Sequence, residues 1–118
     1  MDSNSIGKNG EMAARRFLRA HGYSIIEMNY SCRFGEIDII AQNDEYIVFV
    51  EVKTRNKNYI ASPCEFVGEA KQNRLIKTAQ TYLSLHDVLR QPRFDVIEVV
   101  NSGRFNKKIN HIENAFGV

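Results

Sequence analysis

Two stretches of sequence decide the fold of this chain: residues 34–40, FGEIDII, and residues 47–55, IVFVEVKTR. Both are rich in β-branched and aromatic residues, and the polar segment 42–45, QNDE, separates them, which predicts a β-hairpin. Because side chains alternate along a strand, Glu51 and Lys53 share one face. Strands of Ile, Val and Phe are ordinarily buried, and burying charged groups costs free energy unless they are neutralised. The charges in this hairpin therefore predict a functional site.

The position of Asp38 depends on the register of the hairpin. With a four-residue turn, Asp38 lies opposite Phe49, so Asp38 and Glu51 become diagonal neighbours on one face, about 7–8 Å apart. An odd-numbered loop would move Asp38 to the other face unless a bulge restored the register. Two facing carboxylates repel, and a divalent cation removes that repulsion while supplying a Lewis acid. Oxygen ligands favour Mg²⁺ or Mn²⁺, and Lys53 alongside favours phosphodiester hydrolysis.

The same residues carry a resemblance to a known family. Asp38 followed by Glu51-Val52-Lys53 resembles the D…ExK motif of the restriction-endonuclease-like nuclease superfamily, a short motif that also occurs by chance. The longer strings 33–38 and 48–55 resemble the YraN-like family of small bacterial proteins and are specific. The similarity extends over nearly the whole chain, through Gly7-Lys8-Asn9-Gly10-Glu11, Ala14, Leu18, Lys71-Gln72, Arg74-Leu75, Ala79, Tyr82-Leu83 and Arg93-Phe94-Asp95-Val96. The resemblance implies a nuclease fold similar to that of archaeal Holliday-junction resolvases.

Together, residue chemistry and resemblance predict a metal centre. Asp38 and Glu51 would hold Mg²⁺ or Mn²⁺ with the Val52 backbone carbonyl and waters, while Lys53 would act on the nucleophile or on the charged transition state.

Two further glutamates are candidates for this centre. Glu11 matches the first-helix glutamate that helps to build the metal site in resolvase-like nucleases, whereas a surface pair with Arg15, four residues later, is an equally good structural explanation. Glu36 shares the face of Asp38 by alternation, which makes it a second carboxylate of the site or simply an exposed residue at the start of a strand.

Phosphate-binding candidates come from the distribution of charge. The net charge of +2 is too small to indicate a nucleic-acid-binding protein by itself. Basic residues nevertheless cluster on the first helix, after the hairpin and on the second helix, although most surface Lys and Arg are simply solvated. The candidates are Arg33, Arg55, Lys71, Gln72 and Arg74.

Composition indicates one globular domain over residues 1–118, with 43% hydrophobic and 25% charged residues. We expect no membrane partner, because no apolar run approaches the roughly 18–20 residues of a membrane span. The first residues lack a signal-peptide pattern, so we expect a cytoplasmic protein. Cys32 and Cys64 lack metal-like spacing and are expected as reduced thiols.

The remaining pattern predicts an α/β/α sandwich of the restriction-endonuclease-like kind, with a mixed central sheet and the order α-β-β-β-α-β-β. Gly7 and Gly10 within the first helix indicate close approach to another backbone or to a phosphate. The expected elements are a helix to residue 20, a strand at 23–29, a loop at 30–34, the hairpin, a surface loop or flap at 56–62, a helix from 65 or 68 to 85, and strands at 94–100 and 107–113. Apolar stripes are expected at Ile6, Ala13, Ala14, Phe17 and Leu18, and at Leu75, Ile76, Ala79, Tyr82 and Leu83.

Three functions fit these observations. The leading one is a metal-dependent endonuclease acting on DNA, with branched or damaged DNA as the expected substrate. The second is a nucleic-acid-binding module with the same fold and little or no catalysis. The third is a protein-binding scaffold in which Glu51 forms an internal salt bridge with Lys53 or Arg55. Resolvase-like relatives pair to cut two strands, so an exposed apolar patch would indicate a homodimer.

Overall fold

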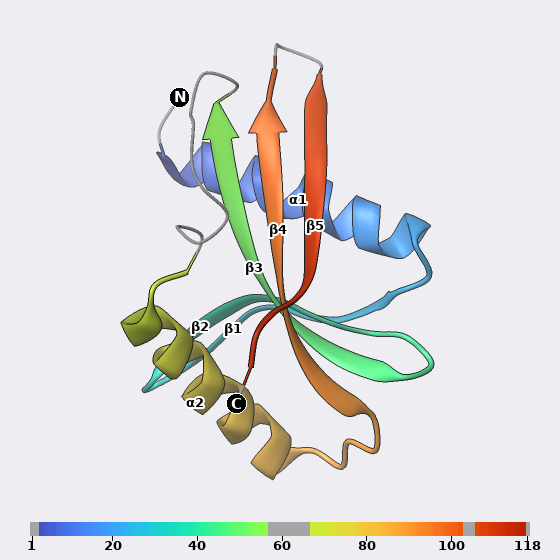
Figure 1. Ribbon diagram of the computed structural model, residues 1–118, viewed down its shortest axis with the longest axis vertical. Coiled ribbons are helices and arrows are strands. Elements are labelled where there is room, and N and C mark those ends of the chain that lie inside the picture. Colours follow the sequence, from blue (N-terminus) through green and yellow to red (C-terminus); the bar gives the residue numbers. More distant parts are fainter. Residues whose placement is uncertain (1–2, 57–66, 103–105, 118) are drawn as a thin grey trace.

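The computed structural model describes residues 3–56, 67–102 and 106–117 of the 118-residue chain, and it has the predicted order of elements. These residues form two helices and five strands, which are labelled in Figure 1. Their bounds are α1 (Ser3–Ala20), β1 (Ser24–Cys32), β2 (Gly35–Gln42), β3 (Tyr46–Asn56), α2 (Glu69–Leu85), β4 (Gln91–Asn101) and β5 (Lys107–Phe116).

The five strands form one mixed sheet in the order β1-β2-β3-β4-β5. Strands β3 and β4 are parallel from Tyr46 beside Gln91 to Asn56 beside Asn101, and the other neighbours are antiparallel. Two parallel neighbours need a crossover, which here contains α2. The strand after the second helix therefore returns beside the site-bearing hairpin, as predicted.

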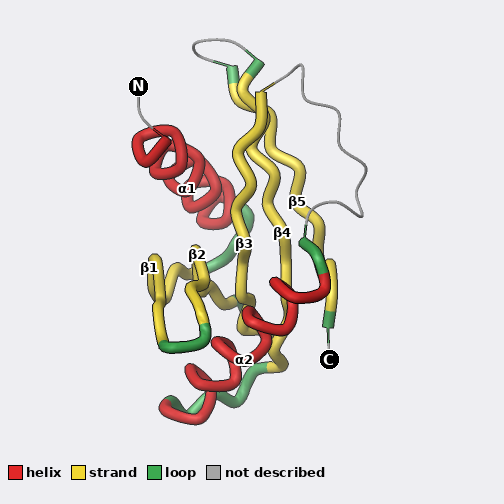
Figure 2. The backbone as a smooth tube through the Cα atoms, turned by 90° about the vertical axis from the view of Figure 1, so that its left-hand side faces the viewer, coloured by secondary structure: helices red, strands yellow, loops and turns green. Residues whose placement is uncertain are grey.

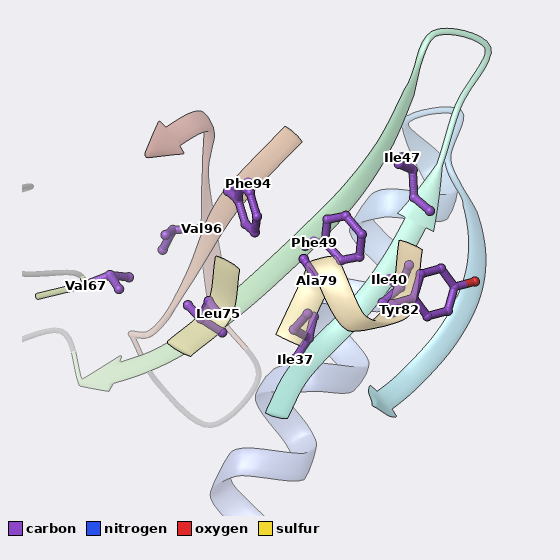
Figure 3. Packing of buried hydrophobic residues seen from close by; sticks show 10 residues of the cluster. All are labelled: Ile37, Ile40, Ile47, Phe49, Val67, Leu75, Ala79, Tyr82, Phe94 and Val96. Atoms are coloured by element: carbon purple, nitrogen blue, oxygen red, sulfur yellow. The ribbon is translucent and has the colours of Figure 1, made fainter. Parts of the chain in front are cut away.

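A helix covers each face of the sheet. Ala14 and Leu18 of α1 are fully buried against one face, in a cluster with Val48 and Val50. On the other face α2 contributes Leu75, Ala79 and Tyr82 to a second cluster, which Figure 3 shows around Ile37, Ile40, Phe49 and Phe94. In Figure 1, α1 passes behind β3 to β5, and Figure 2 places α1 beside β3 and away from α2. The sandwich and both apolar stripes are confirmed, except for the side chain of Ile6, which lies outside the described part.

The hairpin register differs from the prediction by two residues. Phe49 pairs with Ile40, not with Asp38. The turn is tighter than expected because Asn43 N donates to Tyr46 O at 3.0 Å and Asn43 Oδ1 accepts from Glu45 N and Tyr46 N. Gln42 thereby joins the ladder, opposite Ile47. A shift of two keeps the alternation. Asp38 lies one residue beyond the last pair of the ladder, Ile39–Val50, and it lines the same hollow as Glu51.

Several boundaries also differ. The loop expected at 30–34 was wrong: β1 continues to Cys32, which pairs with Gly35 across a tight turn, and Gly35 adopts a φ of 155° that favours glycine. Strand β4 begins at 91 rather than 94, with Pro92 near its exposed start, where a missing N–H is tolerated. Strand β5 continues to Phe116, whose ring stacks on the Phe94 ring with the ring centroids 5.0 Å apart.

Gly10 allows α1 to approach β3, as predicted, because a Cβ there would overlap the Thr54 hydroxyl, whereas a Cβ at Gly7 would meet nothing. Helix α2 begins at Glu69, after Gly68. The predictions for residues 57–66, including the flap, Cys64 and a helix start at 65, lie outside the described residues, and Cys32 is a free thiol. Neither helix in the described part is long and apolar enough to cross a membrane.

Candidate functional site

A hollow of about 260 Å³ opens between the β2–β3 hairpin and the first turns of α2. Figures 1 and 2 both show the end of the β1–β2 hairpin beside α2. The residues lining the hollow are Gly35, Glu36 and Asp38 of β2, Glu51 of β3, and Lys71, Arg74 and Leu75 of α2. The structure therefore brings the predicted carboxylates Asp38 and Glu51 into one open site.

Asp38 is a half-buried carboxylate without a salt bridge in the described part of the chain. Its Oδ2 accepts a hydrogen bond from Val52 N at 2.8 Å, and no basic side chain of the described residues forms a salt bridge with it. Burial, followed by the negative charge of Glu51, raises the pKa of Asp38 to about 7, against the opposing effect of the Val52 hydrogen bond. Near neutral pH this group needs a proton or a cation.

Glu51 is buried, with 6% of its surface exposed, and two lysines approach the same oxygen. Lys71 Nζ lies 2.7 Å from Glu51 Oε1, and Lys53 Nζ lies 3.5 Å from it. Burial and the neighbouring Lys71 lower the pKa of Lys53. Burial acts to lower the pKa of Lys71 too, but its hydrogen bond and charge interaction with Glu51 outweigh this and raise it. Part of the third alternative, an internal salt bridge of Glu51, is therefore present.

Glu11 and Glu36 add negative charge around this centre. Glu11 accepts a hydrogen bond from the Asn29 side chain, and partial burial together with the charges of Glu36 and Glu51 raises its pKa. Among the described residues, Glu11 and Arg15 do not form a salt bridge. The structural explanation of Glu11 as one half of a surface ion pair is therefore not observed. Glu36 lines the hollow but is exposed.

The donor set at this site suits a hard cation. Among the described residues no three His, Cys, Asp or Glu side chains lie close enough to hold a metal ion by themselves. Mg²⁺ characteristically keeps several waters and uses only one or two protein carboxylates. The carboxylates of Asp38 and Glu51 are donors of this kind, and no salt bridge within the described residues engages Asp38.

Lys71, Arg74 and Arg33 are the predicted phosphate contacts that lie at or near the hollow. Arg74 is exposed and lines it, whereas Lys71 lines it while bonded to Glu51. Arg33 is exposed on the β1–β2 turn, with its guanidinium 4.8 Å from the Phe34 ring centroid.

Two other predicted contacts are engaged elsewhere. Arg55 Nε lies 3.3 Å from Glu98 Oε2, in a pair that is largely shielded from solvent. Gln72 Nε2 donates to Val67 O at 2.9 Å, at the start of α2. Neither residue lines the hollow.

Sequence reasoning missed a buried polar network on the α1 face of the sheet. Asp95 is fully buried and accepts hydrogen bonds from Arg93 Nε and Nη2, at 2.9 and 2.8 Å, and from Asn114 N at 3.0 Å. His111 Nε2 lies 2.6 Å from Asp95 Oδ2, and Arg93 also donates to Tyr23 Oη. Burial is outweighed by these bonds, which lower the pKa of Asp95. The signal in the sequence was a carboxylate between apolar residues.

The comparisons with known proteins agree with the resemblance to the YraN-like family. A sequence profile of the uncharacterised protein family UPF0102, which is the YraN family, matches residues 10–99. A UPF0102 protein of Caldanaerobacter subterraneus subsp. tengcongensis is 43% identical over 119 residues, covering 98% of each chain. A UPF0102 protein of Myxococcus xanthus is 44% identical over 111 residues, covering 93% of this chain and 87% of its own. A UPF0102 protein of Caldicellulosiruptor bescii is 45% identical over 121 residues, and the aligned region covers 98% of this chain and 100% of the relative.

Proposed function

This chain belongs to the UPF0102 family of uncharacterised proteins, and from its candidate site we propose that it is a cytoplasmic, Mg²⁺- or Mn²⁺-dependent nuclease that hydrolyses phosphodiester bonds in DNA. The observation that carries the proposal is the convergence of Asp38 and Glu51, from adjacent strands, on one open hollow. Asp38 lacks a cationic partner among the described residues, which distinguishes this pair from an internal ion pair.

Each side chain of the site has a role in this proposal. Asp38 and Glu51, with the Val52 carbonyl, would hold the cation, and Glu11 and Glu36 would lie around it. A bound Mg²⁺ would neutralise the carboxylates and act as a Lewis acid toward the phosphate. Lys53 is not among the residues that line the hollow, but its Nζ lies 3.5 Å from Glu51 Oε1. From this position its ammonium group would orient the attacking water or stabilise the charged transition state.

The exposed basic residues would bind the rest of the substrate. Arg74 lines the hollow and Arg33 is exposed on the neighbouring turn, so in this proposal both would contact phosphates that flank the cleaved bond. Lys71 would contact phosphate only after it leaves Glu51. The similarity to resolvases favours an endonuclease acting on branched or damaged DNA.

A cleavage assay tests the proposal. Wild type, Asp38→Asn, Glu51→Gln and Lys53→Met would be incubated with single-stranded, duplex and four-way-junction DNA, with Mg²⁺, Mn²⁺ or EDTA. Asp44→Asn is the matched control, since Asp44 is an exposed carboxylate on the turn of the same hairpin. We expect metal-dependent cleavage by wild type and the control and none by the three site variants. Cleavage that survived all three substitutions would refute the proposed site.

The second candidate function is a nucleic-acid-binding module without catalysis. The observation in its favour is that Lys53 and Lys71 already neutralise Glu51, so half of the carboxylate pair needs no metal. Binding to labelled DNA, measured by fluorescence anisotropy over a salt series, separates the two functions. Salt-dependent binding that Arg74→Ala weakens, without cleavage under any metal condition, would favour the binding module.

A further inference from the structure

Exposed apolar side chains gather at the C-terminal end of α2, away from the candidate site. Among the described residues four large apolar side chains are exposed, and three of them lie here: Leu89 at 99%, Leu85 at 70% and Ile26 at 38%. They line one hollow of about 550 Å³, together with the core residues Ile47 and Tyr82. Figure 3 shows Ile47 and Tyr82 at the end of the core cluster opposite Val67. Such a concentration of exposed apolar groups is typical of an interaction surface.

The backbone holds these three side chains outward. Ile26 lies at a bulge of β1, where the register shifts between Ile25 and Glu27. Leu85 is the last residue of α2, and Leu89 lies in the connection from α2 to β4. A bulge changes the direction of a side chain. It also interrupts the regular edge of the strand, which hinders pairing with a strand of another molecule.

We propose that this patch, defined by Ile26, Leu85, Asp87, Leu89 and Arg90, is the surface through which two copies of this chain associate about a two-fold axis. An interface between identical copies has to carry its own complement on the same surface. Here a fully exposed leucine, Leu89, lies at a hollow of about 550 Å³ that has both apolar and polar lining residues. The two-fold arrangement places Leu89 of each copy in the hollow of the other.

The charges on the patch have the same self-complementarity. Asp87 and Arg90 are exposed residues of opposite charge that line the same hollow, three positions apart. Arg90 is held by a hydrogen bond from its Nε to Asn43 O at 2.6 Å, so its direction is fixed by the hairpin turn. Across a two-fold axis each Asp87 faces the Arg90 of the other copy, giving two equivalent ion pairs. An acidic or a basic partner would instead be complementary to a patch of one sign.

This association leaves the candidate site open. Lys71 and Leu85 are fourteen positions apart on α2, about 21 Å along the helix axis at 1.5 Å per residue. The patch and the hollow around Glu51 therefore lie at opposite ends of the same helix. Each dimer would expose two such hollows, and the proposal stands whether or not they cleave DNA.

Sedimentation equilibrium over micromolar to submillimolar concentrations tests the proposal. We expect wild type to approach twice the monomer mass and Leu89→Arg to raise the dimer dissociation constant at least about tenfold. Met12→Arg is the matched control, because Met12 is an exposed apolar residue of α1 that lies outside the patch, and we expect this substitution to leave the dissociation constant unchanged. A wild type that stays monomeric throughout, or a dimer equally weakened by both substitutions, would overturn the proposal.

A charge exchange distinguishes a second copy from other occupants. Asp87→Arg and Arg90→Asp should each weaken the dimer, whereas the double variant, which restores opposite charges across the axis, should recover at least part of the affinity. Failure of the double variant to recover any affinity would refute the two-fold pairing. Sedimentation of monomeric wild type with vesicles of phosphatidylcholine and phosphatidylglycerol would also overturn it, in favour of a lipid surface.

Discussion

The replacement Asp38→Asn tests the electrostatics of the candidate site without any assumption about catalysis. The amide keeps an oxygen that can accept the 2.8 Å hydrogen bond from Val52 N, but it removes the negative charge beside Glu51. The pKa of Asp38 rises from 3.8 to about 7 in the folded protein because of burial and then the charge of Glu51. The folded state therefore disfavours the ionised form.

The sign and size of the effect follow from linkage. Below about pH 4 the carboxyl is protonated in both states, and Asp38 carries no penalty. Between about pH 4 and pH 7 the unfolded chain ionises first, so the free energy of unfolding falls as the pH rises. A rise of about three pH units corresponds to about 4 kcal/mol. Because Asp38 is only half-buried, solvent screening reduces this to about 2 kcal/mol.

Urea unfolding at a series of pH values measures this difference. We expect the free energy of unfolding of Asp38→Asn minus that of wild type to increase by about 2 kcal/mol between pH 4 and pH 8. The dependence of the free energy of unfolding on urea concentration should be the same for both proteins. The exposed control Asp44→Asn should follow the wild-type pH profile. Parallel profiles for wild type and Asp38→Asn would show that the carboxylate is not destabilised by its surroundings, and the electrostatic reasoning would be wrong.

The other predictions concern Lys71, Asp95 and Gly10. Lys71→Met should tighten Mg²⁺ binding at least about tenfold in calorimetry, since Lys71 competes for Glu51 Oε1 at 2.7 Å; weaker binding would contradict this. Asp95→Asn should lower the free energy of unfolding by about 3 kcal/mol at pH 7, with the loss shrinking in acid because the folded pKa is depressed; a loss below 1 kcal/mol would count against the network. Gly10→Ala should destabilise by about 1 kcal/mol despite the better helix propensity, and Thr54→Ala in the same chain should recover most of it; additive effects in urea unfolding would exclude the contact.

The hairpin and the two helical stripes could be read from the sequence, because each depends on a local repeat. Because side chains alternate along residues 47–55, Glu51 and Lys53 share one face of the strand. Because of the helical repeat, Leu75, Ala79 and Tyr82 share the buried side of α2. A register error of two residues left these relations intact, since the strand repeat is two.

The partners within the candidate site were decided by tertiary structure. Lys71 meets Glu51 only because the tertiary fold brings the first turn of α2 near the middle of β3, and no local repeat encodes that position. The Asp95 network likewise joins residues as far apart in sequence as Tyr23, just before β1, and Asn114 of β5, through Arg93 and Asp95 of β4. The sequence by itself thus determined which residues share a face, through periodicities of two and 3.6. The packing of helix on sheet decided which charges neutralise one another, and among the described residues it left Asp38 with a backbone hydrogen bond but no salt bridge.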